Sequence, residues 1–367
     1  MNFIISIAGI LFTLGVVIFV HELGHFLACK AVGIRVLKFA FAFGKEVFGF
    51  DWKGTRYSFG WIPLGGYVKP AGEDYLEKMD QNPEPPKKDE YFGKPWYQRI
   101  MVVVAGPFMN YCLALFIFSF VFWVWGGVPK FSGTTVIGEV QQGMPAEASG
   151  LKTGDAIIKI DDAEVKTWDD MAQIIHQSPE KELRIELIRD GKRIVKTITP
   201  RLDQENMVGL IGIYPDVSMT DFTFFQSIKQ GAGMTWLITA KTLSYVGGTI
   251  RRMEKPKEVS GPIGIFKFIS DAAQTGFREL LSLVGLLSVA IGLFNLFPIP
   301  LLDGGHLVFY LIEGIIRKPL NQKVMLVANY VGLGLLLSIF VYASYNDVVR
   351  LRRKNTQETT TEQSISP

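Results

Sequence analysis

Four long runs of apolar residues limit this chain to folds that cross a membrane. They cover residues 1–29, 101–128, 280–302 and 324–345. Each has at least the roughly 20 residues that a helix needs to cross about 30 Å of hydrocarbon. The first run has no basic residue before Lys30 and no small-residue cleavage site, which favours a membrane helix over a cleaved signal peptide. We therefore expect a polytopic α-helical membrane protein with about four transmembrane helices, at 1–29, 99–128, 279–316 and 323–347.

The charge balance and the cysteine content exclude some kinds of partner and site. The chain has 38 basic and 35 acidic residues and a net charge of +3, which gives no basic surface for nucleic acid. Its two cysteines, Cys29 and Cys112, both lie in apolar runs. We therefore expect no structural disulfide and no zinc site built from cysteines.

The segment between the first two runs, residues 30–98, predicts a small sheet. Aromatic and β-branched residues at 36–43 and 56–62 predict strands. Residues 60–68 (GWIPLGGYV) are too apolar for an ordinary solvated turn. They predict either a β-loop that dips into the bilayer or a soluble hairpin with an apolar tip.

The remaining segments have three different compositions. Residues 129–203 predict a soluble α+β domain, because strand patterns alternate with helical patterns at 145–149 and 168–176. Its strands are expected at 135–141, 156–160, 182–189 and 192–199. Residues 204–278 mix aromatic and polar residues, as helices on a membrane surface do. Residues 348–367 are basic and then rich in Ser, Thr and Gln, which predicts a disordered tail.

The end of the first apolar run carries the motif His21-Glu22-Leu23-Gly24-His25, which matches HExxH. Residues i and i+4 share one face of a helix, so His21 and His25 can bind the same ion. Glu22 would lie beside the open coordination position, where a carboxylate can accept a proton from water. The alternative is a set of hydrogen-bonded polar residues. Each ionisable group in hydrocarbon costs about 2.5–3.5 kcal/mol on insertion scales, which favours a bound Zn²⁺ as compensation.

A third ligand must come from another part of the chain. A zinc hydrolase uses three protein ligands and leaves one position for water. Asp303 is the first charged residue after the third apolar run, and Pro298 and Pro300 break the helix just before it. His306 competes for this role. We favour Asp303 as the ligand and His306 as a supporting or packing residue, and the alternative role of Asp303 is a helix cap.

Taken together, these motifs resemble those of bacterial site-2 proteases of the RseP/RasP type. The resemblance covers nearly the whole chain and includes HELGH, 62–68 (IPLGGYV), Ala105-Gly106-Pro107 with Asn110, 260–264 (SGPIG) and the NxxPxPxLDGGH segment at 295–306. It implies an intramembrane zinc metalloprotease, with one Zn²⁺ on His21, His25 and Asp303 and with Glu22 as the catalytic base. Its substrates would be single-pass membrane proteins, such as anti-sigma factors or signal-peptide remnants, already shortened by another protease.

The resemblance also implies where the substrate binds. Asn295, Pro298 and Pro300 fall on a motif that engages the unwound substrate. Residues 39–68, with Gly44, Gly65 and Gly66, would form a membrane-reentrant β-sheet whose edge pairs with an extended substrate. The family commonly has GxG where this chain reads Ala42-Phe43-Gly44. This chain therefore has an alanine at 42, where the family has a glycine that permits close backbone approach.

Residues 129–203 resemble one inserted PDZ domain, through 149–155 (SGLKTGD). Such a domain would capture peptides by strand addition or exclude substrates with large ectodomains. The family implies a multi-pass protein of the bacterial inner membrane, with the PDZ domain on the periplasmic side. Basic residues in the first loop agree with this orientation, whereas those at 350–354 do not. Alternative functions are a non-catalytic, PDZ-bearing membrane adaptor and a zinc protease for soluble substrates.

Overall fold

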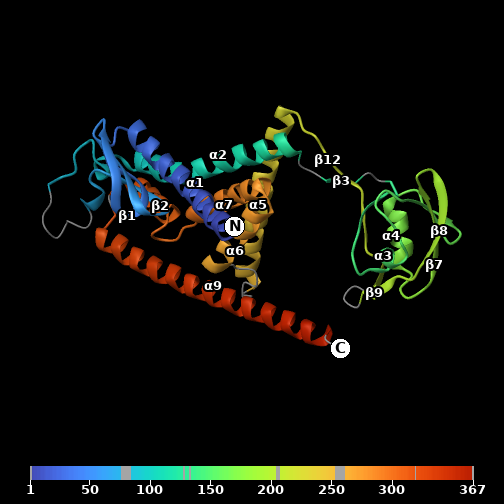
Figure 1. Cartoon of the computed structure of the whole chain (residues 1–367). Coiled ribbons are helices and arrows are strands. Elements are labelled where there is room, and N and C mark those ends of the chain that lie inside the picture. Colours follow the sequence, from blue (N-terminus) through green and yellow to red (C-terminus); the bar gives the residue numbers. More distant parts are fainter. Residues whose placement is uncertain are drawn as a thin grey trace. The chain divides into compact units, whose positions relative to one another are not determined.

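The computed structural model describes residues 2–75, 84–126, 129–131, 134–203, 207–252, 261–318 and 320–365. The chain divides into two compact units, Met1–Val124 with Thr223–Pro367, and Trp125–Phe222. Within the described residues, four helical segments are long and apolar enough to cross a membrane, the number that the sequence predicts (Figure 1). They are α1 (Asn2–Ala31), α2 (Trp96–Trp125), α7 (Phe277–Asn295) and Lys323–Val349 of α9 (Gln322–Ile365).

The third predicted membrane helix is in fact two helices, α7 and α8 (Asp303–Ile316), joined by a tight turn. Two prolines in the turn, Pro298 and Pro300, lack the N–H groups that would continue α7. The turn folds back onto the start of α8, where a Cβ on Gly304 would overlap the carbonyls of Leu296 and Phe297. The glycine after Asp303 is therefore required by close backbone approach.

Two further helices pack on the membrane-spanning ones. Helix α6 (Pro262–Thr275) lies against the first half of α1, where Ser6 Oγ is 2.7 Å from Ser270 Oγ. Helix α5 (Phe224–Arg252) packs on α2, where Thr239 Oγ1 donates to Tyr111 Oη at 3.3 Å. These helices account for most of the segment predicted to lie on a membrane surface, and that location stays a prediction.

The predicted strands at 36–43 and 56–62 belong to longer strands, β1 (Val36–Trp52) and β2 (Thr55–Pro70), which are antiparallel. Each strand bends, so four segments lie side by side in the order 47–52, 55–59, 38–41 and 66–70. Phe39, for example, pairs with Tyr57 on one side and Val68 on the other. Residues 66–70 are therefore an edge of the sheet.

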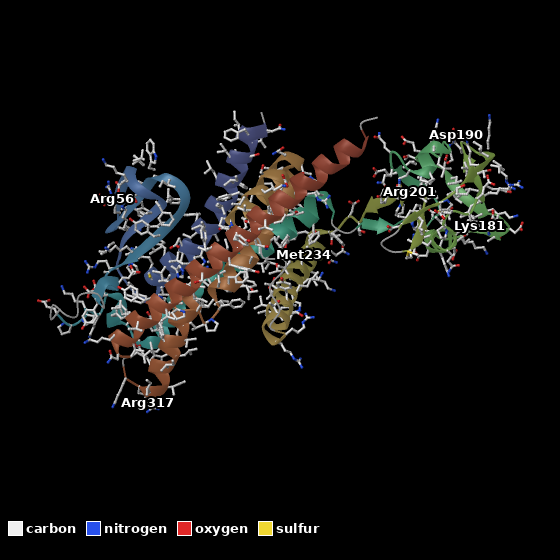
Figure 2. All side chains as sticks on the ribbon, turned by 90° about the horizontal axis from the view of Figure 1, so that it is seen from below. Arg56, Lys181, Asp190, Arg201, Met234 and Arg317 are labelled. Atoms are coloured by element: carbon white, nitrogen blue, oxygen red, sulfur yellow. The ribbon has the colours of Figure 1, made fainter. Side chains whose placement is uncertain are left out.

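The bend in β1 shows why glycine is favoured at position 42. Ala42 has φ 70°, in the left-handed region that favours glycine, and Gly44 has φ 87°. The chain thus makes the bend with an alanine in a strained conformation. Arg56, which Figure 2 labels, holds the far side of the bent sheet together, because it pairs with Glu46 at 2.6 Å and Asp51 at 2.7 Å. Entry of this sheet into the bilayer stays a prediction.

The second unit contains the predicted α+β domain. A four-stranded antiparallel sheet has the order β6-β5-β7-β8, and α4 begins with a capping box at Thr167. Its core is built from buried aliphatic side chains such as Ile157, Ile185 and Leu187. The elements are β3 (Pro129–Phe131), β4 (Ile137–Val140), α3 (Pro145–Ala148), β5 (Ala156–Ile160), β6 (Ala163–Glu164), α4 (Trp168–His176), β7 (Leu183–Arg189), β8 (Lys192–Ile198), β9 (Arg201–Asp203), β10 (Val208–Leu210), β11 (Ile213–Pro215) and β12 (Val217–Met219). These bounds agree with the predicted strands and helices to within a few residues.

The second unit does not end at residue 203, as predicted, but extends to Phe222. The reason is a long-range pairing, because β11 forms an antiparallel ladder with β4, the first strand of the predicted domain. Strand β12 likewise pairs with β3. The chain after 203 therefore completes this unit before it returns to the membrane helices.

An ion pair between a half-buried arginine and a buried carboxylate fixes the loop at 149–155. Asp155 is fully buried and accepts hydrogen bonds from Arg189 at 2.6 and 2.7 Å and from the Lys152 N–H at 2.9 Å. Burial alone would raise the pKa of the Asp155 carboxyl. The bonds from Arg189 and Lys152 outweigh burial, so the pKa of Asp155 lies below its ordinary value.

Residues 348–365 continue α9 as a helix, and the disordered tail at 348–367 stays a prediction. Elongation of an existing helix avoids the cost of nucleation, and this stretch contains no Gly or Pro before residue 367. Near the start of the stretch, Asp347 Oδ1 accepts from the Gly261 N–H at 3.0 Å and Asp347 Oδ2 from the Gly264 N–H at 2.8 Å, which ties α9 to the start of α6.

Candidate metal centre

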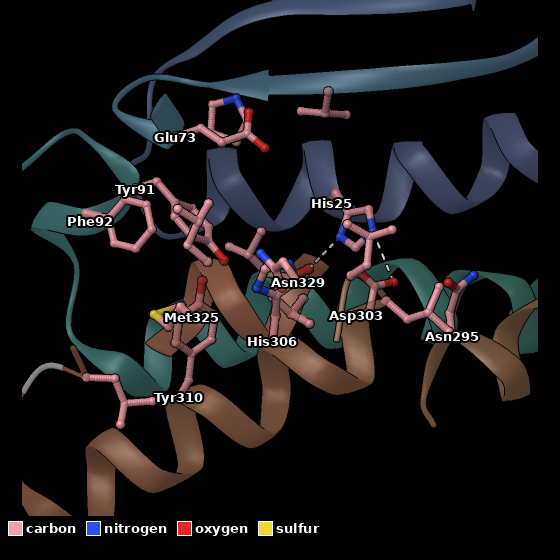
Figure 3. Close-up of a pocket in the computed structure, with 18 of the residues that line it drawn as sticks. His25, Glu73, Tyr91, Phe92, Asn295, Asp303, His306, Tyr310, Met325 and Asn329 are labelled. Atoms are coloured by element: carbon pink, nitrogen blue, oxygen red, sulfur yellow. Dashed lines mark hydrogen bonds and ion pairs between the residues drawn. The ribbon is translucent and has the colours of Figure 1, made fainter. Parts of the chain in front are cut away.

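Three side chains from α1 and α8 converge on one point. Nε2 of His21 and Nε2 of His25 are 3.2 Å apart, and Asp303 Oδ2 lies 3.2 Å from the first and 3.5 Å from the second (Figure 3). Zinc bound tetrahedrally at about 2.0–2.1 Å separates its ligand atoms by about 3.3 Å. The three distances therefore fit a single Zn²⁺ and leave a fourth position free.

Two glycines allow the helices to approach closely enough to form this centre. A Cβ on Gly24, between the two histidines, would overlap the backbone carbonyl of Ala105 in α2. A Cβ on Gly106 would overlap Nε2 of His25 and lie 2.9 Å from Cε1 of His21. The space beneath the two imidazoles thus exists because residue 106 has no side chain.

The imidazole of His25 is oriented by a backbone carbonyl. Its Nδ1 lies 2.8 Å from the carbonyl oxygen of Val102. Because a carbonyl only accepts, Nδ1 must carry the proton and Nε2 keeps a lone pair for a metal. Pro107 interrupts the backbone ladder of α2 next to this point, since it has no N–H to donate.

The imidazole of His21 is oriented by Asn110, a residue that the sequence marked only as part of a motif. The Asn110 amide lies 3.3 Å from His21 Nδ1, and the residue is fully buried. Nδ2 of Asn110 is the atom nearer Nδ1, and Oδ1 has no hydrogen-bond partner among the described residues. Because the two ends of an amide can be exchanged by a flip, we place the oxygen toward Nδ1–H, which gives both groups a partner and frees Nε2 for a metal. Ser288 Oγ in turn donates to the Asn110 main-chain oxygen at 2.8 Å.

Glu22 lies on the side of α1 that faces the sheet. Its Oε2 accepts from the Val68 N–H at 3.2 Å, and Gly66 lies beneath its Cγ. Glu22 also lines the same cavity as His21, His25 and Asp303. The carboxylate is therefore placed between the metal centre and the free edge of the sheet at 66–70.

The structure brings together only part of the predicted substrate site. Asn295, the last residue of α7, lines the cavity, and Gly66 lies beside Glu22. The described cavity is not lined by Pro298, Pro300, Gly44 or Gly65. These four residues instead shape turns and contacts nearby, because Gly65 packs on the Phe43 ring and the Pro300 carbonyl lies against Gly332 of α9. His306 lines the cavity but lies outside the three-ligand group.

Comparison with known proteins gives matches along most of the chain. Residues 9–339 match the model of peptidase family M50. Metalloprotease MmpA of Caulobacter vibrioides is 32% identical over 387 residues, covering 95% of this chain and 96% of that protein. A protein of Rhizobium meliloti (strain 1021), provisionally named a zinc metalloprotease, is 33% identical over 363 residues, covering 94% and 96%.

Among solved structures, the PDZ domain of an SdrC-like protein from Listeria monocytogenes matches at 24% identity. It covers 24% of this chain and 93% of that domain, with a TM-score of 0.21. The PDZ assignment of the second unit stays a prediction.

Proposed function

This chain belongs to peptidase family M50, the site-2 protease family, and we propose that it is an intramembrane zinc metalloprotease that hydrolyses peptide bonds in membrane-spanning segments. One observation carries the proposal. His21, Glu22, His25 and Asp303 meet in one cavity that is walled by helices long and apolar enough to span a membrane. Burial of ionisable residues within a membrane costs free energy. Such groups are therefore rare there and usually mark a functional site.

One Zn²⁺ would be held by His21, His25 and Asp303. When bound, it activates water and polarises the scissile carbonyl. The protein's own contribution to this site is orientation. Asn110 and the Val102 carbonyl fix the ring nitrogens of the two histidines, and Gly106 leaves the space beneath them.

Glu22 is the general base of the proposed reaction. Its carboxylate accepts a proton from the attacking water and then passes that proton to the leaving amide nitrogen, so that it ends the reaction unprotonated. The hydrogen bond from the Val68 N–H holds the carboxylate toward the cavity.

The substrate would bind as an extended strand along the edge at 66–70. Intact helical amides are hydrogen-bonded and shielded, so a transmembrane substrate must unwind before it is cut. An edge strand can pair with an extended chain through the backbone groups that no neighbouring strand occupies, and at this edge the Val68 N–H is already bonded to Glu22. Asn295 supplies an amide donor and acceptor on the opposite side of the cavity.

Single-pass proteins of the bacterial inner membrane, such as anti-sigma factors or signal-peptide remnants, are the proposed substrates, with the PDZ-like unit on the periplasmic side.

The Glu22→Gln variant tests this function. The amide keeps the shape of the side chain and removes the base, so zinc should stay at one per chain while cleavage of a model transmembrane substrate is lost. Cleavage at a rate near that of the unaltered protein would contradict the proposal. Absence of zinc from the unaltered protein would instead favour a non-catalytic adaptor.

A further inference from the structure

The cavity at the metal centre is larger than the chemistry of hydrolysis needs. Its volume is about 1040 Å³. One water occupies about 30 Å³ of liquid, and pockets that enclose most of a bound ligand have volumes of about 300–1,000 Å³. The cavity therefore has room for a piece of peptide chain in addition to the attacking water.

The residues that line the cavity extend to one side of the metal centre, away from Asn295. In Figure 3 the cavity passes from Asn295, His25 and Asp303 to a group of side chains that are aromatic or apolar. We call this part the aromatic arm, and it is lined by Tyr91, Phe92, Tyr310, Leu320 and Met325. Exposed polar and charged residues, Glu73, Asn321 and Lys323, line the cavity beyond the arm, so the arm leads out to solvent.

The length of the arm follows from α8. Asp303, His306 and Tyr310 all line the cavity and recur at i, i+3 and i+7, which places them on one face of the helix. Seven residues of α-helix rise about 10 Å. An extended chain advances about 3.3 Å per residue, so about three substrate residues fit beside this face.

The walls of the arm are fixed by a buried ion pair. Arg99 of α2 pairs with Glu313 of α8, and the two residues are 7% and 6% exposed. The Arg99 guanidinium carbon lies 4.4 Å from the centroid of the Tyr310 ring. Glu313 also accepts from the Leu320 N–H at 3.1 Å, which fixes the connection to α9. The arm is thus formed before a substrate enters.

Two buried polar atoms between the metal centre and the arm lack partners. His306 Nδ1 and Asn329 Oδ1 make no hydrogen bond among the described residues, and both side chains line the cavity. An extended peptide entering this apolar space carries N–H and C=O groups that need partners. These two side chains, from α8 and α9, are suited to supply them.

The sheet edge sets the direction of the bound chain. Residues 66–70 run from Glu22 toward Pro70, and Pro70 and Glu73 line the same cavity as the arm. Antiparallel strand pairs outnumber parallel pairs by about two- to three-fold. A substrate strand that pairs antiparallel with this edge has its N-terminal side at Pro70, and therefore in the arm.

We infer that the aromatic arm binds about three residues of the extended substrate directly N-terminal to the scissile bond, and that it selects large apolar side chains there. The inference rests on the proposed proteolytic function, because it extends the same site. Aromatic and thioether walls recognise apolar side chains by contact area, and the arm offers no charged partner until its outer end.

Photo-crosslinking tests the position of the bound chain. Tyr310 is replaced by p-azidophenylalanine, which nearly matches tyrosine in size, in the Glu22→Gln enzyme. This enzyme is irradiated together with a model single-pass substrate. The cross-linked residues are then mapped by mass spectrometry. We expect cross-links to the first three residues N-terminal to the scissile bond. The matched control is Tyr330→p-azidophenylalanine on α9, because Tyr330 is 66% exposed and does not line the cavity. Absence of cross-links at Tyr310, or cross-links only to residues C-terminal to the bond, overturns the inference.

A filling variant tests the same space by kinetics. Met325→Trp should lower kcat/KM by about tenfold or more, chiefly through KM, while zinc stays at one per chain. Val331→Trp adds the same ring to α9 at a 66% exposed position, and its kcat/KM should match that of the unaltered enzyme. If both variants cleave equally well, the arm is not a substrate site, although the protease function stands. If the unaltered, zinc-loaded enzyme cleaves no transmembrane substrate, the proposed function itself fails.

Discussion

The amide of Asn110 lies 3.3 Å from Nδ1 of His21, so a side chain of α2 orients a metal-binding side chain of α1. Both residues are buried, and the Asn110 main-chain oxygen is itself bonded to Ser288 of α7. Three helices, α1, α2 and α7, are therefore linked through Asn110. Hydrogen bonds of this kind fix the tautomer of a ligand and raise its basicity.

Loss of the Asn110 amide should weaken metal binding. In Asn110→Ala the Nδ1 proton of His21 has no acceptor, and we expect the zinc dissociation constant to rise by about 10- to 100-fold. Asn110→Asp keeps an acceptor at the same position and should retain more of the affinity. Competition with a zinc chelator on the purified protein measures both variants. Equal affinities in Asn110→Ala and the unaltered protein would show that the contact does not orient the ligand.

Substitution of Asp303 and substitution of His306 should have different effects on zinc content. Asp303 Oδ2 lies 3.2 Å from Nε2 of His21, whereas His306 lies outside the ligand group. Asp303→Asn removes a charged ligand, so zinc measured by elemental analysis after dialysis should fall well below one per chain. His306→Asn should remain near one per chain. The reverse result would make His306 the third ligand.

A methyl group at residue 106 should disrupt the metal centre. A Cβ there would overlap His25 Nε2 and lie 2.9 Å from His21 Cε1. Gly106→Ala is therefore expected to lose most of its zinc and its cleavage activity. Gly15→Ala, on α1, is the matched control, because nothing lies within 4 Å of a Cβ at that position. Zinc content and cleavage rate are measured for both variants side by side. Equal values in Gly106→Ala and Gly15→Ala would contradict the prediction.

The second unit should lose stability in acid. The pKa of Asp155 in the folded protein lies below its ordinary value, so this group stabilises the fold above the unfolded pKa, about 3.9. That contribution is lost as the pH falls through the folded pKa. Hydrogen exchange of the β5 and β7 amides is measured in the full chain and corrected for intrinsic rates. The protection of these amides should decrease when the pH is lowered below about 4.

The partner of Asp155 provides the control for this pH dependence. Arg189→Met leaves the buried Asp155 carboxylate without its cation and should destabilise the second unit near pH 7. The difference from the unaltered protein should shrink in acid, where Asp155 is protonated. A difference that stays constant from pH 7 to pH 3 would place the effect of Arg189 elsewhere.

The sequence alone determined the features that depend on local pattern. The membrane helices follow from the length of the apolar runs, and the pairing of His21 with His25 on one face follows from helical spacing. Most strands and helices of the second unit also follow from periodicity and turn residues.

Tertiary structure decided everything that depends on contacts between distant segments. The placement of Asp303 rather than His306 against the two histidines depends on the rotation of α8, which the proline turn and Gly304 set through backbone contacts. The roles of Gly106 and Asn110 depend on how closely α2 approaches α1. The extension of the second unit to Phe222 depends on a ladder between strands about 75 residues apart in the chain. Local patterns carry no record of these approaches, because each is fixed by backbone packing between segments that the sequence separates.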